Sequence, residues 1–282
     1  MISGTRYQLQ REVNRQLRLA TDVARAQAEI STGKRILAPS DDPVGAARVA
    51  DIGRTQANQD TWRTNLDSAS ALASNAEGVL AALTSAFDRV NELMLRASNA
   101  TLSAENRSAI ALELESIAEE VATLRDTRDS RGEPLFASAS AAIRIPVGVD
   151  LAIAAVGTRE SIFESADTPA GTRSLTAILD GAVNAVRSGN PAAIAGALDQ
   201  TNAGTRHIIS AHGEQGSRGA RIETLRDRLE GYAIELEEER SSVESADIME
   251  VVARLQSRKL SLDAAQATFA RINRSTLFDL LS

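Results

Sequence analysis

The chain has 282 residues, of which 43% are hydrophobic but only 3% aromatic, with a net charge of −7 and a pI of about 5.1. Both signs of charge are mixed along it, which argues against a nucleic-acid surface, and the absence of cysteine excludes disulfides and thiol catalysis. We expect neither a cleaved secretory signal peptide nor membrane insertion, because no apolar stretch is long enough for either.

A first helix is predicted over residues 5–32. Its apolar stripe is narrow and rich in alanine: Leu9, Val13, Leu17, Ala20, Val23 or Ala24, and Ile30. The arginines of this segment lie largely off the stripe, as on a solvated face; a helix lying on a membrane surface is the alternative. We expect such a thin stripe to leave 1–40 and 245–282 poorly ordered in a free monomer.

Residues 31–50 predict a helix–loop–helix connector. Gly33 can end the first helix in a left-handed conformation. Asp42 is the predicted N-cap of the next helix, with Pro43 at its first position.

Two interleaved seven-residue series run through 52–97, with spacings that alternate between four and three. One series is Ile52, Gln59, Leu66, Ala73, Leu80, Phe87 and Met94, and the other is Thr55, Trp62, Ala69, Ala76, Leu83, Val90 and Ala97. This pattern is typical of a coiled-coil seam. A helix from Pro43 to the end of this seam would be roughly 80 Å long, so it needs partner helices of similar length.

A shorter helix is predicted over 104–128, capped by Ser103, before Gly132 and Pro134 interrupt the pattern. Residues 137–170 then predict a small β excursion that either docks on the helical body or projects from it. Its strands are expected at 143–147 and 149–156, and Ile162 with Phe163 can extend the sheet.

Helix resumes over 173–187, and a second long helix starts after Asn190 and Pro191. One heptad frame then holds to 243, so this helix is the natural partner of 43–97. A new frame starts at Ile248 and gives a terminal helix that matches 5–32 in length.

The predicted fold is therefore mostly α: an elongated antiparallel coiled coil or helical bundle whose N- and C-terminal helices pair, with a small β excursion in the middle of the chain. Three domains are expected. They are a terminal coiled-coil assembly domain (1–42 with 245–282), a helical body (43–136 with 171–244) and the β insert (137–170).

No constellation for catalysis, a metal or a cofactor is evident, so an enzyme is the least expected class. His207 and His212 are five residues apart and do not share a helix face as metal ligands would. Gly213, Gly216 and Gly219 lack the preceding strand that a phosphate-binding loop needs, and indicate close helix approach or a soft point instead.

Several segments resemble the flagellin superfamily and, within it, the proteins of the hook–filament junction. They are STGKRILAPSDDPVGAARVA at 31–50, SNATLSAENR at 98–107, RGEPLFA at 131–137, EQGSRGARIETL at 214–225, and a C-terminus ending in STLFDLL. The resemblance covers about 1–136 and 190–282 and is weak over 137–189.

This resemblance implies a structural protein that joins hook to filament and templates flagellin assembly. It implies an extracellular location on the bacterial flagellum, export without a cleaved signal, and a cytoplasmic export chaperone. The implied partners are hook-associated protein 1 on the hook side, flagellin on the filament side, and further copies of the chain in a ring. The alternatives are a filament-forming flagellin with a reduced outer domain and a non-flagellar coiled-coil scaffold.

Two sets of residues are the candidate interfaces. The proposed assembly and chaperone interface comprises Leu9, Val13, Leu17, Ile248, Leu255, Leu262, Phe269 and Ile272. The proposed seam of the body comprises Leu66, Leu80, Leu83, Phe87, Ile222, Leu225, Leu229 and Leu236.

Overall fold

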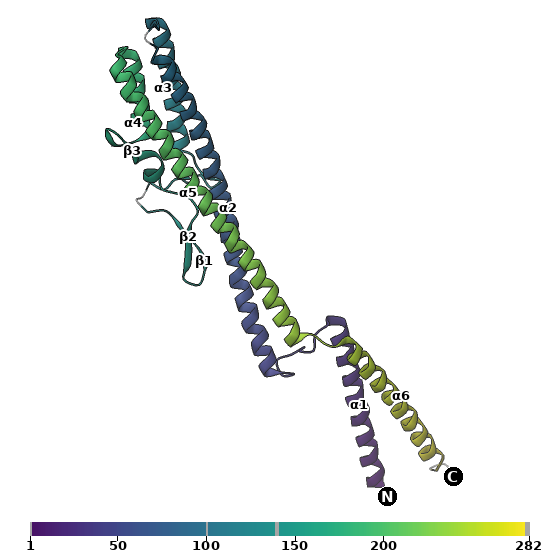
Figure 1. Ribbon diagram of the computed structural model, residues 1–282. Coiled ribbons are helices and arrows are strands. Elements are labelled where there is room, and N and C mark those ends of the chain that lie inside the picture. Colours follow the sequence, from purple (N-terminus) through teal and green to yellow (C-terminus); the bar gives the residue numbers. More distant parts are fainter. Residues whose placement is uncertain (1, 100, 139–140, 280–282) are drawn as a thin grey trace. The chain divides into compact units, whose positions relative to one another are not determined.

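The computed structural model describes residues 2–99, 101–138 and 141–279 (Figure 1). The helices are α1 (Ile2–Thr32), α2 (Pro43–Ala97), α3 (Ala104–Arg125), the π-helical turn η1 (Glu160–Glu164), α4 (Leu175–Ser188), α5 (Pro191–Glu244) and α6 (Ile248–Asp279). The strands are β1 (Arg144–Gly148), β2 (Leu151–Ala154), β3 (Ala166–Thr168) and β4 (Gly171–Arg173). The mostly α prediction with a small β excursion is confirmed.

The chain forms two compact units, one of Asn58–Gly231 and one of Met1–Ala57 with Tyr232–Ser282. Both boundaries fall inside the long helices α2 and α5. The predicted domains divide the chain at 42/43 and 244/245 instead, where these helices end.

The predicted caps set the helix ends. The Asp42 carboxylate accepts the Gly45 N–H at 2.9 Å, and α2 starts at Pro43. Ser103 caps α3 through the Asn106 N–H, and Asn190 caps α5 through the Ala192 N–H. Gly33 follows α1 with φ of 68°, the left-handed conformation that ends a helix.

The core of the Asn58–Gly231 unit is the seam between α2 and α5. Leu66, Leu80, Leu83 and Phe87 are fully buried on α2, and Ile222 is buried on α5. Leu225 and Leu229 are partly buried against the same core, while Leu236, in the other unit, is half-buried. The heptad pattern therefore identified the buried face of both helices.

The register of this seam follows from contacts between the two long helices. Arg226 pairs with Asp67, and a Cβ at Gly204 would lie 2.6 Å from the Phe87 ring, so the two helices are antiparallel. Leu80 lies thirteen positions after Asp67 on α2. Because the helices are antiparallel, the residue at the same level on α5 lies thirteen positions before Arg226, which is Gly213. Leu80 and Leu83 thus lie level with 208–215, and only Leu66 lies level with Leu225 and Leu229.

The central segment is built into this core, which decides between the two predicted alternatives. Phe136 and Phe163 are fully buried and pack edge to face, with ring centroids 5.2 Å apart. Gln215 on α5 is fully buried and donates to the Ala155 carbonyl at 2.8 Å. The insert is therefore docked on the helices.

Two details of the insert were predicted wrongly. Ile162 and Phe163 do not extend a sheet but lie in η1, because Thr158 and Ser161 exchange side-chain-to-backbone hydrogen bonds of 3.1 Å that wind the chain. The strand expected over 149–156 is only Leu151–Ala154, since Asp150, with φ of 55°, forms part of the turn between β1 and β2. A second hairpin, β3–β4, was not predicted at all.

Gly204→Ala tests the tightness of the seam. The new methyl group would collide with the buried Phe87 ring, so we expect the free energy of unfolding of the body to fall by about 1–3 kcal/mol, as for other overpacked cores. The measurement is urea denaturation. Gly213→Ala is the matched control: nothing lies within 4 Å of its Cβ position, so it should gain up to about 1 kcal/mol in helix propensity. Equal effects of the two substitutions would contradict the packing described here.

Candidate assembly interface

The terminal helices α1 and α6 lie side by side as an antiparallel pair (Figure 1). The Gln16 amide donates to the Ala265 carbonyl at 3.2 Å, Arg258 lies 3.7 Å from Asp22, and Arg254 lies 3.4 Å from Glu29. Where the structure describes the side chains of these two helices, the buried ones are Leu19, Ala26, Glu29, Val251 and Ala265. The predicted pairing of the first and last segments is therefore observed.

The residues that make this pair are largely not those of the predicted interface. Val13 and Leu17 are exposed on α1, and Ile248 is exposed at the start of α6. Leu255, Leu262 and Phe269 are half-buried. The side chains of Leu9 and Ile272 lie outside the described residues.

Among the described side chains of the pair, Glu29 is the one charged group that is buried, and two arginines bind it. Its carboxylate accepts from Arg25 Nε at 3.1 Å and from Arg254 Nη1 at 3.4 Å. Truncating one partner of such a buried pair leaves a desolvated charge, so this contact favours the observed register over others. The sequence does not predict this contact, because a single carboxylate on a polar helix carries no periodic signal.

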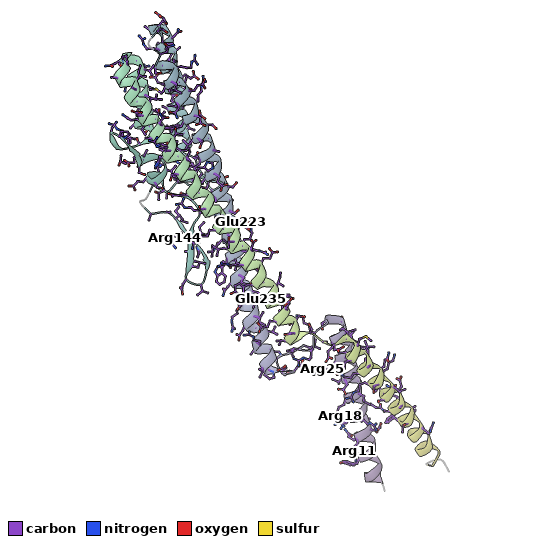
Figure 2. All side chains as sticks on the ribbon, in the orientation of Figure 1. Arg11, Arg18, Arg25, Arg144, Glu223 and Glu235 are labelled. Atoms are coloured by element: carbon purple, nitrogen blue, oxygen red, sulfur yellow. The ribbon has the colours of Figure 1, made fainter. Side chains whose placement is uncertain are left out.

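Helix α1 also carries exposed arginine and apolar side chains. Arg11, Arg15 and Arg18 are exposed and follow one another at spacings of four and three, and Arg11 lies over the Tyr7 ring at 5.9 Å. Figure 2 labels Arg11 and Arg18 on this helix. The exposed residues Val13 and Leu17 lie on another side. α1 therefore offers surfaces for contacts beyond its own chain.

The connector between α1 and α2 is bound to the segment between α5 and α6. The Arg35 N–H donates to the Glu244 carbonyl at 2.7 Å, and the Ala246 N–H donates to the Gly33 carbonyl at 2.9 Å. Lys34 also forms a 3.1 Å ion pair with the Glu244 carboxylate. These contacts hold together the two segments that lead into the terminal helices.

Two neighbouring carboxylates organise the connector itself. The Asp41 carboxylate accepts the N–H groups of Ala38 and Leu37 at 3.0 and 3.1 Å and pairs with Arg25 at 3.0 Å. The Asp42 carboxylate caps α2 and pairs with Arg35 at 3.0 Å. The Ala38 N–H is the main cause that lowers the pKa of Asp41, and the Gly45 N–H is the main cause that lowers the pKa of Asp42.

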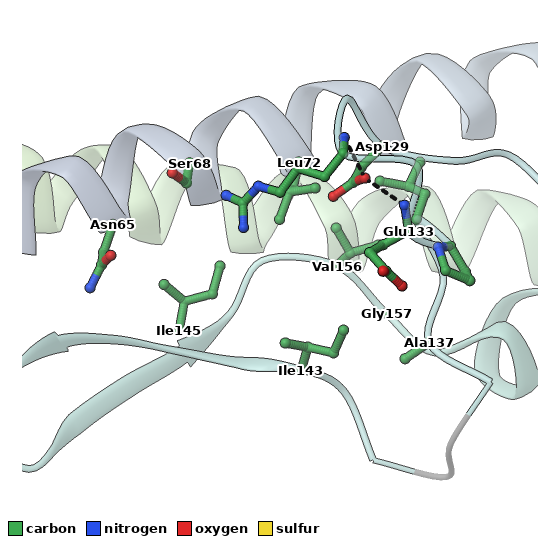
Figure 3. A pocket seen from close by; sticks show the side chains of 13 residues that line it. Asn65, Ser68, Leu72, Asp129, Glu133, Ala137, Ile143, Ile145, Val156 and Gly157 are labelled. Atoms are coloured by element: carbon green, nitrogen blue, oxygen red, sulfur yellow. Dashed lines mark hydrogen bonds between the residues drawn. The ribbon is translucent and has the colours of Figure 1, made fainter.

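A pocket of about 240 Å³, lined by both apolar and charged side chains, lies in the Asn58–Gly231 unit between α2, the 129–137 loop and the β1–β2 hairpin (Figure 3). Ile143 and Ile145 point from the hairpin towards Leu72 on α2. Asp129 at its rim accepts the N–H groups of Arg131 and Glu133, at 2.9 Å each, and so shapes the loop.

The histidines take structural positions. His207 Nε2 lies 3.1 Å from the Ile162 carbonyl and so links α5 to η1, and His212 is half-buried on α5. Among the described residues, no three histidine or carboxylate side chains converge on a point that could hold a metal ion. Within the same part of the chain, no helix is long and apolar enough to cross a membrane.

Comparisons with known proteins agree on one group of relatives. Residues 7–141 match the model of the bacterial flagellin N-terminal helical region. The flagellar hook-associated proteins 3 of Escherichia coli and Salmonella typhimurium are 24% and 26% identical to the chain, over 89% of its length and 90% of theirs. The crystal structure of flagellar hook-associated protein 3 from Legionella pneumophila shares the fold, with a TM-score of 0.62 at 14% identity over 69% of this chain and 98% of its own.

The connector should respond to pH through Asp41. Because its pKa is lower in the folded chain than in the unfolded one, its stabilising contribution is complete above the ordinary carboxyl pKa. It is lost as the pH falls through the lowered value, which lies below the ordinary carboxyl pKa. In NMR spectra the Leu37 and Ala38 amides should therefore titrate with a midpoint below the ordinary carboxyl pKa.

Asp41→Asn is the control for this titration. It should abolish the titration at Leu37 and Ala38 but keep that of the Gly45 amide, which reports on Asp42. A midpoint at or above the ordinary carboxyl value for Leu37 and Ala38 would contradict the assignment.

Proposed function

We propose that this chain, which belongs to the flagellin superfamily, is a structural protein of the bacterial flagellum that forms the junction between hook and filament. The observation that carries this proposal is the similarity to two flagellar hook-associated proteins 3, which extends over 89% of the chain rather than over one shared helix. The shared fold supports the same group. The role is structural rather than enzymatic.

The partners in this proposal are hook-associated protein 1 on one side, flagellin on the other, and further copies of the chain in a ring. The terminal helix pair supports a role in assembly because large apolar side chains stay exposed on both of its helices. The body buries a continuous apolar core along the α2–α5 seam within its own chain.

The same exposed residues support a cytoplasmic export chaperone. An amphipathic helix with an uncovered apolar face invites aggregation before assembly. A chaperone that covers α6 would prevent this and would have to leave before the helix joins the flagellum. In the proposed route the chain is exported without a cleaved signal to its extracellular site on the flagellum.

A filament-forming flagellin is the second candidate. The match of residues 7–141 to the flagellin N-terminal region favours it, as does the short stretch between α3 and α5, which leaves room only for a reduced outer domain. Immunogold labelling separates the two. A junction protein is labelled only at the hook–filament boundary, whereas label along the whole filament would overturn the junction role.

Phe269→Asp tests the role of α6. Phe269 is half-buried on this helix, and a carboxylate there would disfavour apolar contacts with chaperone and neighbours alike. We expect loss of chaperone binding and of incorporation at the hook tip, measured by pull-down and by labelling. The melting temperature of the body should stay unchanged, because its seam lies on other helices.

Ile209→Asp is the matched control, since Ile209 is a similarly large apolar side chain exposed on α5 of the body. It should preserve both chaperone binding and incorporation. A Phe269→Asp chain that keeps its affinity for the chaperone and still supports filament growth would rule out this role of Phe269.

A further inference from the structure

Three glycines inside the two long helices have no packing reason to be glycine. Among the described residues, nothing lies within 4 Å of the Cβ position of Gly78 on α2 or of Gly213 and Gly216 on α5. Glycine inside a helix lowers the stability of that helix, because its backbone gains the most freedom on unfolding. Close helix approach within the chain therefore does not explain Gly213 and Gly216, and a soft point in the helix does.

The three glycines lie at one level of the α2–α5 pair. Arg226 on α5 pairs with Asp67 on α2, and the two helices are antiparallel. Gly78 lies eleven positions after Asp67, so the residue at its level on α5 lies eleven positions before Arg226, at position 215. Gly213 and Gly216 stand on either side of that position. Both long helices are therefore softened at the same place.

The seam between the two helices is also thin at this level. From 67 to 78 the buried residues of α2 are all alanines, and from 209 to 221 those of α5 are Ala211 and Gln215. Large buried side chains resume at both ends of this stretch, with Leu66 and Ile222 on one side and Leu80 and Ile208 on the other. Alanines make fewer contacts across a seam than leucines, so this level separates two better-packed parts of the core.

Gln215 does not replace the missing apolar contacts between the two helices. It is fully buried, and its Nε2 donates to the Ala155 carbonyl of the insert at 2.8 Å. Its Oε1 has no hydrogen-bond partner among the described residues. A buried acceptor without a partner destabilises the packing around it. Gln215 therefore ties the insert to α5 but does not tie α5 to α2.

Ser217 gives α5 a second reason to bend at this level. Its hydroxyl donates to the Gly213 carbonyl, one turn earlier, at 3.1 Å. A serine bond of this kind competes with the helical hydrogen bond at the same carbonyl and often bends the helix. Gly216 directly precedes Ser217, and glycine–serine pairs are common sites of helix kinks. The glycines and the serine thus act on the same turn.

The pocket of about 240 Å³ lies beside this stretch of α2, on the side of the insert (Figure 3). Ser68 and Leu72 line it from α2, one and two turns before Ala76. Ile143 and Ile145 point at Leu72 from the hairpin. A close-packed core resists bending because its side chains have nowhere to move. The pocket leaves α2 room to move towards the insert.

We propose that the body bends at the level of Gly78, Gly213 and Gly216, which together form a flexure between two stiffer arms. One arm contains Leu80, and the other contains Leu66. A gentle bend tilts backbone carbonyls and keeps the helical hydrogen bonds, so the seam stays closed in both arms. The body can then meet neighbours at more than one curvature without repacking its core. Because this property belongs to the single chain, it goes beyond the proposed function and does not depend on it.

Residual dipolar couplings of backbone amides, measured by NMR on the purified chain, test the flexure. They give a separate alignment tensor for each arm, from the amides of 58–77 and of 79–94 on α2. In the natural chain the two tensors should differ in magnitude, because the arms move relative to each other. One common tensor for both arms would overturn the proposal.

A chain with both Gly213→Ala and Gly216→Ala stiffens α5 at the flexure. Both Cβ positions are open, so the fold should be kept and the two tensors should converge. The matched control carries Gly196→Ala and Gly231→Ala, which lie on the same helix, away from the flexure, with Cβ positions that are equally open. It gains the same helix propensity but should keep the two tensors different.

The melting temperatures of the two double variants show whether they are matched, and they should rise alike because each replaces two open glycines of α5. Two tensors that stay different in the Gly213→Ala, Gly216→Ala chain would overturn the proposal. Equal convergence in the control chain would overturn it as well, since it would show that stiffness anywhere along α5 has the same effect.

Discussion

The close contact of Phe87 with Gly204 is the constraint on which the body of the molecule depends. A side chain at 204 would collide with the buried ring, so this glycine lets α5 approach α2 and fixes the antiparallel register of the two long helices. That register aligns the buried residues from Leu66 to Met94 with those from Thr201 to Ile222. It also brings Gln215 to the Ala155 carbonyl, which anchors the central insert to α5. The insert then contributes Phe136 and Phe163 to a core that two helices alone would leave open.

The side chains of the α2–α5 seam become less buried from Leu225 onwards, and polar contacts replace apolar ones. Leu225 and Leu229 are only partly buried, and Tyr232, which continues the heptad series, is exposed. In the unit that contains the terminal helices, the ends of α2 and α5 are joined by polar contacts such as Arg48 with Glu239 and Gln56 with Glu237. In the described part of the terminal pair few side chains are buried, and one of them is the carboxylate of Glu29. The chain thus combines a self-sufficient apolar core with a terminal pair whose free apolar surface is suited to partners.

The sequence predicted the parts of the fold that depend on long periodic patterns. Heptads built on Leu, Ile and Phe identified the buried faces of α2 and α5, because large apolar side chains that repeat every 3.5 residues all lie on one face of a helix. The caps at Asp42, Ser103 and Asn190 were predictable because each rests on a few adjacent residues. The register of α2 against α5 was not predictable, because it depends on a contact between Phe87 and Gly204, which are far apart in the sequence. The sides of α1 and α6 that pair were also missed, since stripes of alanine and single leucines fit several helix faces almost equally well.

Hydrogen exchange of the full chain as a dilute monomer tests most directly the claim that the body is self-sufficient and the terminal pair is not. The account predicts strong protection of amides in 66–94 and 201–222, where the seam is sealed, and much faster exchange throughout α1 and α6. Few buried contacts hold the terminal pair in one chain, so its helices should open without unfolding of the body. Equally strong protection of α1, α6 and the seam in the dilute monomer would contradict this account.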